Sequence, residues 1–185
     1  MRGFVFEPKT KFLDPEKIVF QTGLSKGQKV ADLGAGNGFY AFASSKIVGD
    51  SGEVFVVDIL EDALSHVSSE ARLKGLRNIK TIRADLEQSD ACDSIVAGSM
   101  DLVIFANVFH QIKNPEELFR QAYRLLKSGG KVLVVEWNSQ PSPFGPDFSL
   151  RVPEKQVSEW ANKKAFRLVS SIETDRYHYG LIFTR

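Results

Sequence analysis

A glycine-rich loop stands between an apolar segment and a helical pattern, and its residues are Gly34, Ala35, Gly36, Asn37 and Gly38. The apolar segment Lys29–Leu33 has the length of one buried strand, and the helical pattern begins at Phe39. A glycine turn between a strand and a helix lets the backbone approach a ligand closely, and the N–H groups that begin the helix favour an anionic group. The segment therefore predicts a ligand-binding loop.

Acidic residues lie at or near the ends of three apolar segments, at Asp32, Asp58 and Asp85. Asp58 follows Gly38 by 20 residues, and a carboxylate at that distance can accept hydrogen bonds from both hydroxyls of a ribose. A single Asp at such a position is more often the N-cap of a helix. Three acids in this spacing after a glycine loop favour ligand contact instead.

Two phosphate-binding patterns compete with this interpretation. The dinucleotide fingerprint G-x-G-x-x-G/A requires Gly or Ala where this chain has Phe39, and Gly38 comes one place too early. The phosphate-binding P-loop requires G-K-S/T, which does not follow the glycines here.

The pattern D-x-G-x-G-x-G at Asp32, Gly34, Gly36 and Gly38 resembles motif I of the class I S-adenosylmethionine-dependent methyltransferases. The resemblance runs from about Leu24 to Glu136 and is strongest to the compact small-molecule branch that includes the ubiquinone/menaquinone-biosynthesis type. It implies transfer of a methyl group from S-adenosylmethionine to O, N or C of a small molecule, with S-adenosylhomocysteine as the second product.

The same resemblance implies a set of cofactor contacts. Asp32 would orient the methionyl amino end, Asp58 would bind the ribose, and Asp85 would accept from the adenine amine. Ile59 and Leu86 would pack on the adenine ring, and Asn107 would lie near the methionyl part. The glycine-loop residues complete the predicted cofactor-binding set: Gly34, Ala35, Gly36, Asn37 and Gly38.

His110 is the candidate catalytic residue. It follows the fourth apolar segment, in a stretch that resembles motif IV, and a histidine beside the transferred methyl could act as a general base. A loop-ordering role is the alternative. Methyl transfer to an aligned acceptor gains much of its acceleration from proximity, so a dedicated base is optional.

Short apolar segments alternate with amphipathic ones, as is typical of a parallel sheet covered by helices. The predicted strands are Lys29–Leu33, Val54–Asp58, Ile79–Ile82, Leu102–Phe105, Val132–Val135, Phe166–Ile172 and Tyr179–Phe183. The predicted helices are Pro15–Gly23, Phe39–Val48, Glu61–Lys74, Pro115–Leu126 and Glu154–Lys164, with Gly129-Gly130 as the stop after the fourth.

The last two strands are too close in sequence for a helical crossover, so they should form an antiparallel hairpin at the sheet edge. Together with the resemblance, this predicts an α/β Rossmann-like methyltransferase fold. Its seven-stranded, mostly parallel sheet would have the order 3-2-1-4-5-7-6, with strand 7 antiparallel and helices on both faces. We expect one domain over 1–185, with 1–26 as an N-terminal segment and helix and the Pro-rich loop 138–153 as a candidate lid over the substrate.

Composition excludes several classes of function. The chain has 24 Lys and Arg against 23 Asp and Glu, so its charge does not favour binding to nucleic acid or to an anionic membrane. The N-terminus has no apolar run of signal-peptide length and no segment is long enough to span a membrane, which predicts a cytoplasmic protein. Cys92, the one cysteine, lies in a polar stretch that predicts a solvated loop.

Metal and nucleic-acid chemistry are not expected. No ligand spacing predicts a metal site, and His66 and His178 are expected on the surface. A single cysteine argues against the arsenite methyltransferases, which share this core but use several cysteines. The stretch Asn107-Val108-Phe109-His110 lacks the D/N-P-P-Y/F pattern of enzymes that methylate a flipped base.

The acceptor is expected to be a small molecule, and a protein acceptor stays open, as does a noncatalytic cofactor-binding module. An oxidoreductase is a weaker alternative, which Phe39 opposes. Apolar or aromatic acceptors are slightly favoured, because six of the phenylalanines could line a pocket: Phe12, Phe39, Phe105, Phe109, Phe144 and Phe148. The pocket roof could come from the N-terminal segment, from the Pro-rich loop or from a second subunit in a homodimer.

Overall fold

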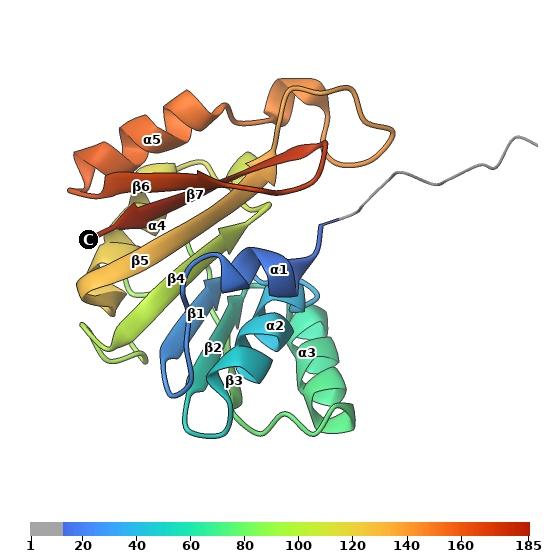
Figure 1. Ribbon diagram of the computed structural model, residues 1–185, viewed down its shortest axis with the longest axis vertical. Coiled ribbons are helices and arrows are strands. Elements are labelled where there is room, and N and C mark those ends of the chain that lie inside the picture. Colours follow the sequence, from blue (N-terminus) through green and yellow to red (C-terminus); the bar gives the residue numbers. More distant parts are fainter. Residues whose placement is uncertain (1–12) are drawn as a thin grey trace, which may run out of the picture.

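The predicted strands form one seven-stranded sheet in the computed structural model, which describes residues 13–185 (Figure 1). The order is β3-β2-β1-β4-β5-β7-β6, as predicted. The pairs among β1 to β5 are parallel, whereas β7 runs antiparallel to both β5 and β6. The strands are β1 (Lys29–Leu33), β2 (Glu53–Asp58), β3 (Ile79–Arg83), β4 (Met100–Ala106), β5 (Leu126–Trp137), β6 (Arg167–Ile172) and β7 (His178–Thr184).

Helices cover both faces of the sheet, and each layer buries its own apolar cluster (Figure 1). One face carries α1 (Pro15–Phe20), α2 (Phe39–Val48) and α3 (Glu61–Leu73). The other carries α4 (Pro115–Leu125) and α5 (Glu154–Lys163). Asp14 is the N-cap of α1, because its carboxylate accepts a hydrogen bond of 3.2 Å from the Lys17 N–H.

The boundary between α4 and β5 differs from the prediction. The glycine pair does not end the helix, which stops at Leu125, and Leu126 already has an extended backbone. Leu126 pairs with Met100, after which a register irregularity precedes the pairing of Leu102 with Lys131. The glycines belong to this irregular start of the strand because the pairing of Leu126 with Met100 begins the strand before them.

The polar stretch around Cys92 is not a solvated loop at that residue. The Cys92 side chain is fully buried in the cluster beneath α4, and its backbone oxygen accepts a hydrogen bond from Arg124. Burial raises the pKa of the thiol to about 11, so it stays protonated and behaves as a small apolar side chain. In contrast, His66 is exposed on α3, as predicted.

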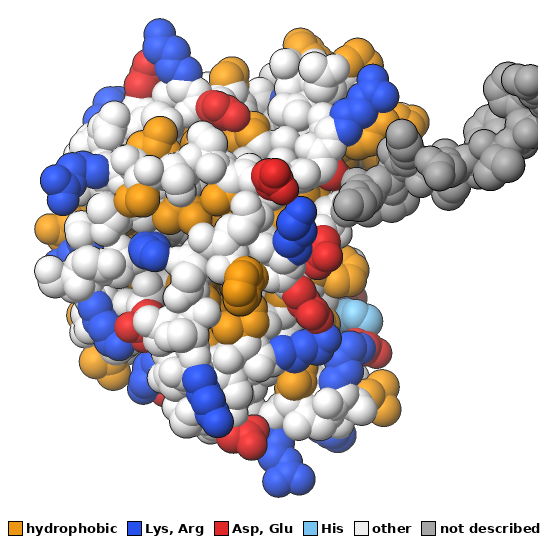
Figure 2. Space-filling view, in the orientation of Figure 1, with side chains coloured by type: hydrophobic (Ala, Val, Ile, Leu, Met, Phe, Trp, Pro, Cys, Tyr) orange, Lys and Arg blue, Asp and Glu red, His pale blue; other side chains and the backbone are white. Residues whose placement is uncertain are grey.

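Charge is dispersed over the surface, and Figure 2 shows basic and acidic side chains interspersed on the face it presents. Within residues 13–185, no helix is long and apolar enough to cross a bilayer.

The Pro-rich loop after β5 is held mainly by one side chain. Arg151 donates hydrogen bonds of 2.7–3.4 Å to four main-chain oxygens of the loop, those of Asn138, Gln140, Phe144 and Pro146. The loop is irregular as predicted, except for a short 3-10 turn, η2 (Phe148–Leu150). The loop also packs on Trp137, the last residue of β5.

Replacing Gly145 by Ala should release this loop. A Cβ at Gly145 would lie 2.7 Å from the Trp137 ring, which cannot move freely because it packs on His178 at a centroid distance of 4.1 Å. We expect the free energy of unfolding, measured in urea, to fall by about 1–3 kcal/mol more than in Gly129→Ala. Gly129 is the matched control, because its φ of +76° is also left-handed but nothing lies within 4 Å of an added Cβ. Equal losses in the two variants would contradict the packing argument.

Candidate functional site

A cavity of about 460 Å³ opens at the carboxyl ends of β1, β2, β3 and β4. Ligands of open parallel sheets bind at this edge, where the strand order reverses between β1 and β4. The cavity is lined by Gly34, Ala35, Gly36, Asp58, Ile59, Leu60, Ala84, Asp85, Leu86, Glu87, Ala106, Asn107, Val108, Gln111 and Ile112. Eight of the predicted cofactor contacts are therefore brought together around one space: Gly34, Ala35, Gly36, Asp58, Ile59, Asp85, Leu86 and Asn107.

Asp58 ties the glycine loop to the start of α3. One carboxylate oxygen accepts a hydrogen bond from the Gly36 N–H at 2.8 Å, and the other accepts from the Leu60 N–H at 2.9 Å. The residue is only 8% exposed, yet it lines the cavity. Each carboxylate oxygen of Asp58 keeps a second lone pair. The carboxylate can therefore hold the glycine loop and bind a ligand at the same time.

The glycine loop approaches its neighbours too closely for a side chain at Gly34. A Cβ there would lie 2.5 Å from Cγ2 of Val108, and φ is +76°. Gly36 differs, because an added Cβ would meet no protein atom within 4 Å, and its φ is +51°. The glycine loop therefore packs tightly against Val108 at Gly34 and leaves free space beside Gly36, so a ligand can approach the backbone there. Asn37 and Gly38, which were predicted as contacts, are not among the residues that line the cavity.

Asp85, Leu86 and Ile59 all line the cavity. One Asp85 oxygen accepts from the Glu87 N–H at 3.0 Å and the other from the Gln88 amide at 3.3 Å, so the carboxylate is fixed in orientation. Leu86 is buried, whereas Ile59 is half exposed beside the opening. An acid and two aliphatic side chains around one cavity can bind a flat, polar-edged ring.

Asp32 is the most unusual acid of the site. It is 1% exposed, and neither carboxylate oxygen has a hydrogen-bond partner among the described residues. Burial and, to a smaller extent, the nearby negative charge of Asp58 raise the pKa of this carboxyl from 3.8 to about 7, while an interaction with the Ala41 backbone N–H lowers it in part. A buried carboxyl of this kind fits a cationic partner, although Asp32 is not among the residues that line the cavity.

Asn107 and His110 follow β4. Asn107 has a left-handed backbone with φ of +54°, which is uncommon for a residue other than glycine, and its side-chain oxygen is buried without a partner. The His110 side chain is 16% exposed and does not line the cavity. Its Nδ1 lies 3.9 Å from an oxygen of Glu136, which is too far for a hydrogen bond.

Glu136 is a buried acid that the sequence analysis did not single out. It is 0% exposed near the end of β5. Its carboxylate accepts from the Phe109 N–H at 2.8 Å and from the Trp137 N–H at 3.4 Å, which fixes the turn before His110. The sequence does contain a signal for Glu136. It is an acid directly after the apolar run Val132–Val135, just as Asp58 follows an apolar run.

The surface prediction for His178 is wrong. This first residue of β7 is 6% exposed, and its Nδ1 lies 2.7 Å from Oδ1 of Asp175. Because β7 is antiparallel and pairs His178 with Trp137, its first residue lies at the end where β5 finishes. The position of His178 at this edge follows from the antiparallel pairing of β7 with β5. The spacing of residues along the sequence does not reveal that pairing.

The phenylalanines divide into two groups. Phe105 and Phe109 are buried in the core and contact each other edge to face, whereas Phe39, Phe144 and Phe148 are largely exposed. Phe12 lies outside the described residues, as do the other residues of 1–12 that were considered as a roof. The five described phenylalanines therefore do not line one common pocket. Among residues 13–185, no group of three or more His, Cys, Asp or Glu side chains is placed to hold a metal ion.

Comparison with known proteins gives consistent matches. The family model of a methyltransferase domain matches residues 24–183. The ubiquinone/menaquinone biosynthesis C-methyltransferase UbiE of Haemophilus ducreyi is 31% identical over 118 residues, which cover 63% of this chain and 44% of that protein. The enzyme of the same name from Psychromonas ingrahamii is 32% identical over 119 residues, covering 64% and 46% of the two chains. The chain thus matches less than half the length of these curated relatives.

Among solved structures, a SAM-dependent methyltransferase from Aquifex aeolicus superimposes with a TM-score of 0.85. The alignment covers 94% of this chain and 90% of that one at 24% sequence identity, which establishes a shared fold.

Proposed function

This chain belongs to the methyltransferase domain family, and from that premise we propose that it transfers a methyl group from S-adenosylmethionine to a small-molecule acceptor. The observation that carries the proposal is the cavity at the carboxyl edge, where the glycine loop and Asp58 meet beside the unpartnered carboxyl of Asp32. The names of the UbiE relatives favour a carbon atom as the acceptor, with oxygen or nitrogen as the alternatives.

The residues of the site fit this cofactor. Its adenine ring matches Ile59, Asp85 and Leu86, and its ribose hydroxyls match the remaining lone pairs of Asp58. Asp32 fits the methionyl ammonium group, because a nearby cation stabilises a carboxylate that burial otherwise disfavours. Asn107, whose side-chain oxygen lacks a partner, would bind the same methionyl part.

The protein's contribution to the chemistry would be alignment. The bound cofactor supplies a methyl carbon activated by its positively charged sulfur. The site residues would hold that carbon in line with the attacking atom of the acceptor and exclude water, and such positioning can supply much of the acceleration. We propose that the acceptor lies beyond β4 and β5, at the end of the sheet where β5 finishes at Trp137 and the loop 138–153 lines an open cavity of about 270 Å³. His110 stays a candidate base.

Two measurements test the proposed function. Calorimetric titration should show binding of S-adenosylmethionine and of S-adenosylhomocysteine, and a cofactor labelled in its methyl group should transfer label to the small-molecule fraction of a cell extract. Absence of cofactor binding at millimolar concentration would refute the site. Binding without labelled product would favour a noncatalytic module, and label in the protein fraction would favour a protein methyltransferase.

A further inference from the structure

Buried polar atoms without a hydrogen-bond partner gather at the carboxyl edge of the sheet. Among the described residues, most such atoms belong to Asp32, Tyr40, Asn107, His110 and His178. Native proteins leave few buried polar atoms unpaired, and each one calls for an explanation. The predicted cofactor accounts for Asp32 and Asn107, but it leaves Tyr40 and His178 unexplained.

His178 and Asp175 form a buried pair. Each side chain is only 4% exposed, and the Asp175 oxygen that contacts Nδ1 of His178 also accepts a hydrogen bond from the Tyr177 N–H at 2.9 Å. The ring is fixed further by Trp137, whose centroid lies 4.1 Å away. In the neutral imidazole, donation from Nδ1–H to Asp175 leaves Nε2 unprotonated, and Nε2 has no partner in the described chain.

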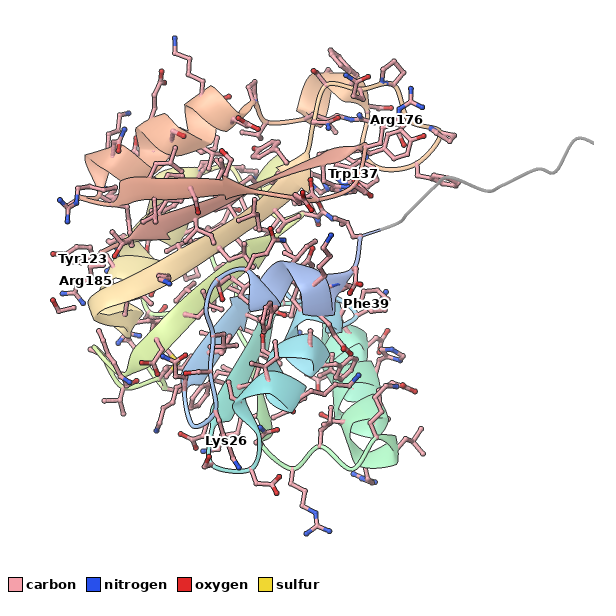
Figure 3. The ribbon with its side chains drawn as sticks, viewed as in Figure 1. Lys26, Phe39, Tyr123, Trp137, Arg176 and Arg185 are labelled. Atoms are coloured by element: carbon pink, nitrogen blue, oxygen red, sulfur yellow. The ribbon has the colours of Figure 1, made fainter. Side chains whose placement is uncertain are left out.

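The pair lies at the same edge and on the same face of the sheet as Asp32. Alternate residues of a strand share a face, so His178 lies on the face of Ile182 and Asp32 on that of Val30, and both of those aliphatic residues belong to the cluster under α1 to α3. His178 pairs with Trp137, the last residue of β5. Figure 3 shows Trp137 at the edge where Phe39 begins α2.

Strands β4 and β5 lie between β1 and β7, so Asp32 and His178 are separated by three strand spacings, or about 14 Å, across the sheet. Tyr40 lies on α2. Burial raises the pKa of its hydroxyl, and the negative charges of Asp32, Asp175 and Glu136 raise it further.

We propose that Nε2 of His178 is the general base that takes a proton from the methyl acceptor, and that Asp175 is its positioning residue. The inference rests on the proposed methyltransferase function. For a hydroxyl acceptor, the O–H bond breaks and the proton passes to Nε2, while an oxygen electron pair forms the new bond to the methyl carbon. The methyl–sulfur bond breaks, and its electron pair stays on the sulfur. For a carbon acceptor, the proton leaves from the carbon that has gained the methyl.

The geometry favours His178 over His110 for this role. The Nδ1 of His110 has no hydrogen-bond partner, so nothing on the ring selects its tautomer. The Nδ1 of His178 is bound to a carboxylate, an arrangement that orients the ring and stabilises the imidazolium formed when the base is protonated.

The electrostatic surroundings of His178 are consistent with a neutral base. Burial lowers the pKa of its imidazole, while hydrogen bonding to Asp175 and the charges of Asp175 and Glu136 oppose that shift. The guanidinium of Arg151, which lies over Trp137, lowers the pKa slightly further. The lowered pKa favours the unprotonated ring, which is the form that a proton acceptor requires.

This assignment defines a class of acceptor. The attacking atom must lose a proton in the reaction, as the oxygen of a phenol or enol does, or the carbon of an electron-rich ring. A thioether or a tertiary amine attacks without proton loss and would gain nothing from the base.

Nitrogen NMR on the wild-type protein with bound S-adenosylhomocysteine tests the assignment without turnover. At pH 7, the His178 signal, identified by its absence in His178→Gln, should show a protonated Nδ1 and an unprotonated Nε2. Addition of 1-naphthol should shift the Nε2 signal more than the Nδ1 signal, whereas 1-methoxynaphthalene, which has no proton to give, should not. A protonated Nε2, or the same response to both compounds, would overturn the proposal.

The second test measures the rate at which labelled methyl is transferred to the small-molecule fraction of a cell extract. His178→Gln should lower the rate about 10²–10⁴-fold, as expected for loss of a general base, with cofactor affinity unchanged. His66→Gln, a substitution on the exposed part of α3, should match the wild type. Full activity in His178→Gln would exclude the base.

The variant Asp175→Asn tests whether Asp175 acts on the His178 imidazole or only stabilises the fold. Because Asp175 raises the pKa of His178, its removal should move the acidic limb of the pH–rate profile to lower pH. An unmoved limb would mean that Asp175 does not act through the imidazole. Failure of the wild type to bind cofactor would refute the proposed function, whereas cofactor binding without the His178 responses would refute only the base.

Discussion

Replacing Asp32 by Asn should stabilise the cofactor-free protein at pH 8 by about 2 kcal/mol. The pKa of this carboxyl rises from 3.8 to about 7 mainly because burial disfavours its charged form, and the Ala41 backbone offsets this only in part. A rise of about 3 pKa units corresponds to roughly 4 kcal/mol of lost stability once the group must ionise. The amide of Asn avoids that cost but stays unpaired, so the net gain is smaller.

The sign of the pH dependence follows from the same rise. Between about pH 4 and pH 7, the folded protein holds a proton that the unfolded chain has released, so stability falls as the pH rises through this window. Urea unfolding should therefore show Asp32→Asn less stable than the wild type near pH 4, where only the unpaired amide counts, and more stable at pH 8, where the wild type must ionise Asp32. Asp62→Asn, an exposed change on α3, is the control. A constant difference between Asp32→Asn and wild type across this range would contradict the assigned ionisation.

The same substitution should weaken cofactor binding, because the methionyl ammonium group would lose its anionic partner. In the wild type, affinity should rise with pH up to about 7 as Asp32 ionises. A variant that is more stable and binds less tightly would identify Asp32 as a residue kept for its ligand.

Replacing Asp58 by Ala should reduce the affinity for S-adenosylhomocysteine by about 100-fold or more. The carboxylate accepts from Gly36 and Leu60, and hydrogen bonds to a charged group contribute about 1.5–3 kcal/mol each. Removing it would release the glycine loop and also remove the predicted ribose contact. Calorimetric titration measures the affinity directly.

Asp58→Asn provides a graded comparison. Its single amide oxygen can accept from only one of the two N–H groups, so the loss of affinity should lie between wild type and Asp58→Ala. Asp62→Asn again should change nothing. Unaltered affinity in Asp58→Ala would remove Asp58 from the site.

The sequence predicted the strand order and the terminal hairpin because apolar segments of strand length, short connections and the family resemblance all agreed. The cavity residues from Gly34 to Leu86 were also predictable, because local spacing after β1, β2 and β3 places them at one edge. The end of α4 was not predictable from the glycine pair, because the pairing of Leu126 with Met100 overrides the local stop signal.

His178 and Cys92 show what local patterns miss. Both stand in polar stretches, yet tertiary contacts bury them, His178 through the antiparallel return of β7 and Cys92 beneath α4. The left-handed backbone of Asn107 could not be predicted either. The residues around it carry no sequence pattern that indicates such a conformation at a residue other than glycine.

The way Arg151 holds the Pro-rich loop bears on how this protein can evolve. The guanidinium binds main-chain oxygens, at Asn138, Gln140, Phe144 and Pro146, and these oxygens are present whatever the side chains are. The anchoring therefore places little constraint on the identity of residues such as Ser139 and Pro141. Because we propose that the acceptor lies beside this loop, we expect drift or library selection in it to change acceptor preference while its path over the sheet is retained.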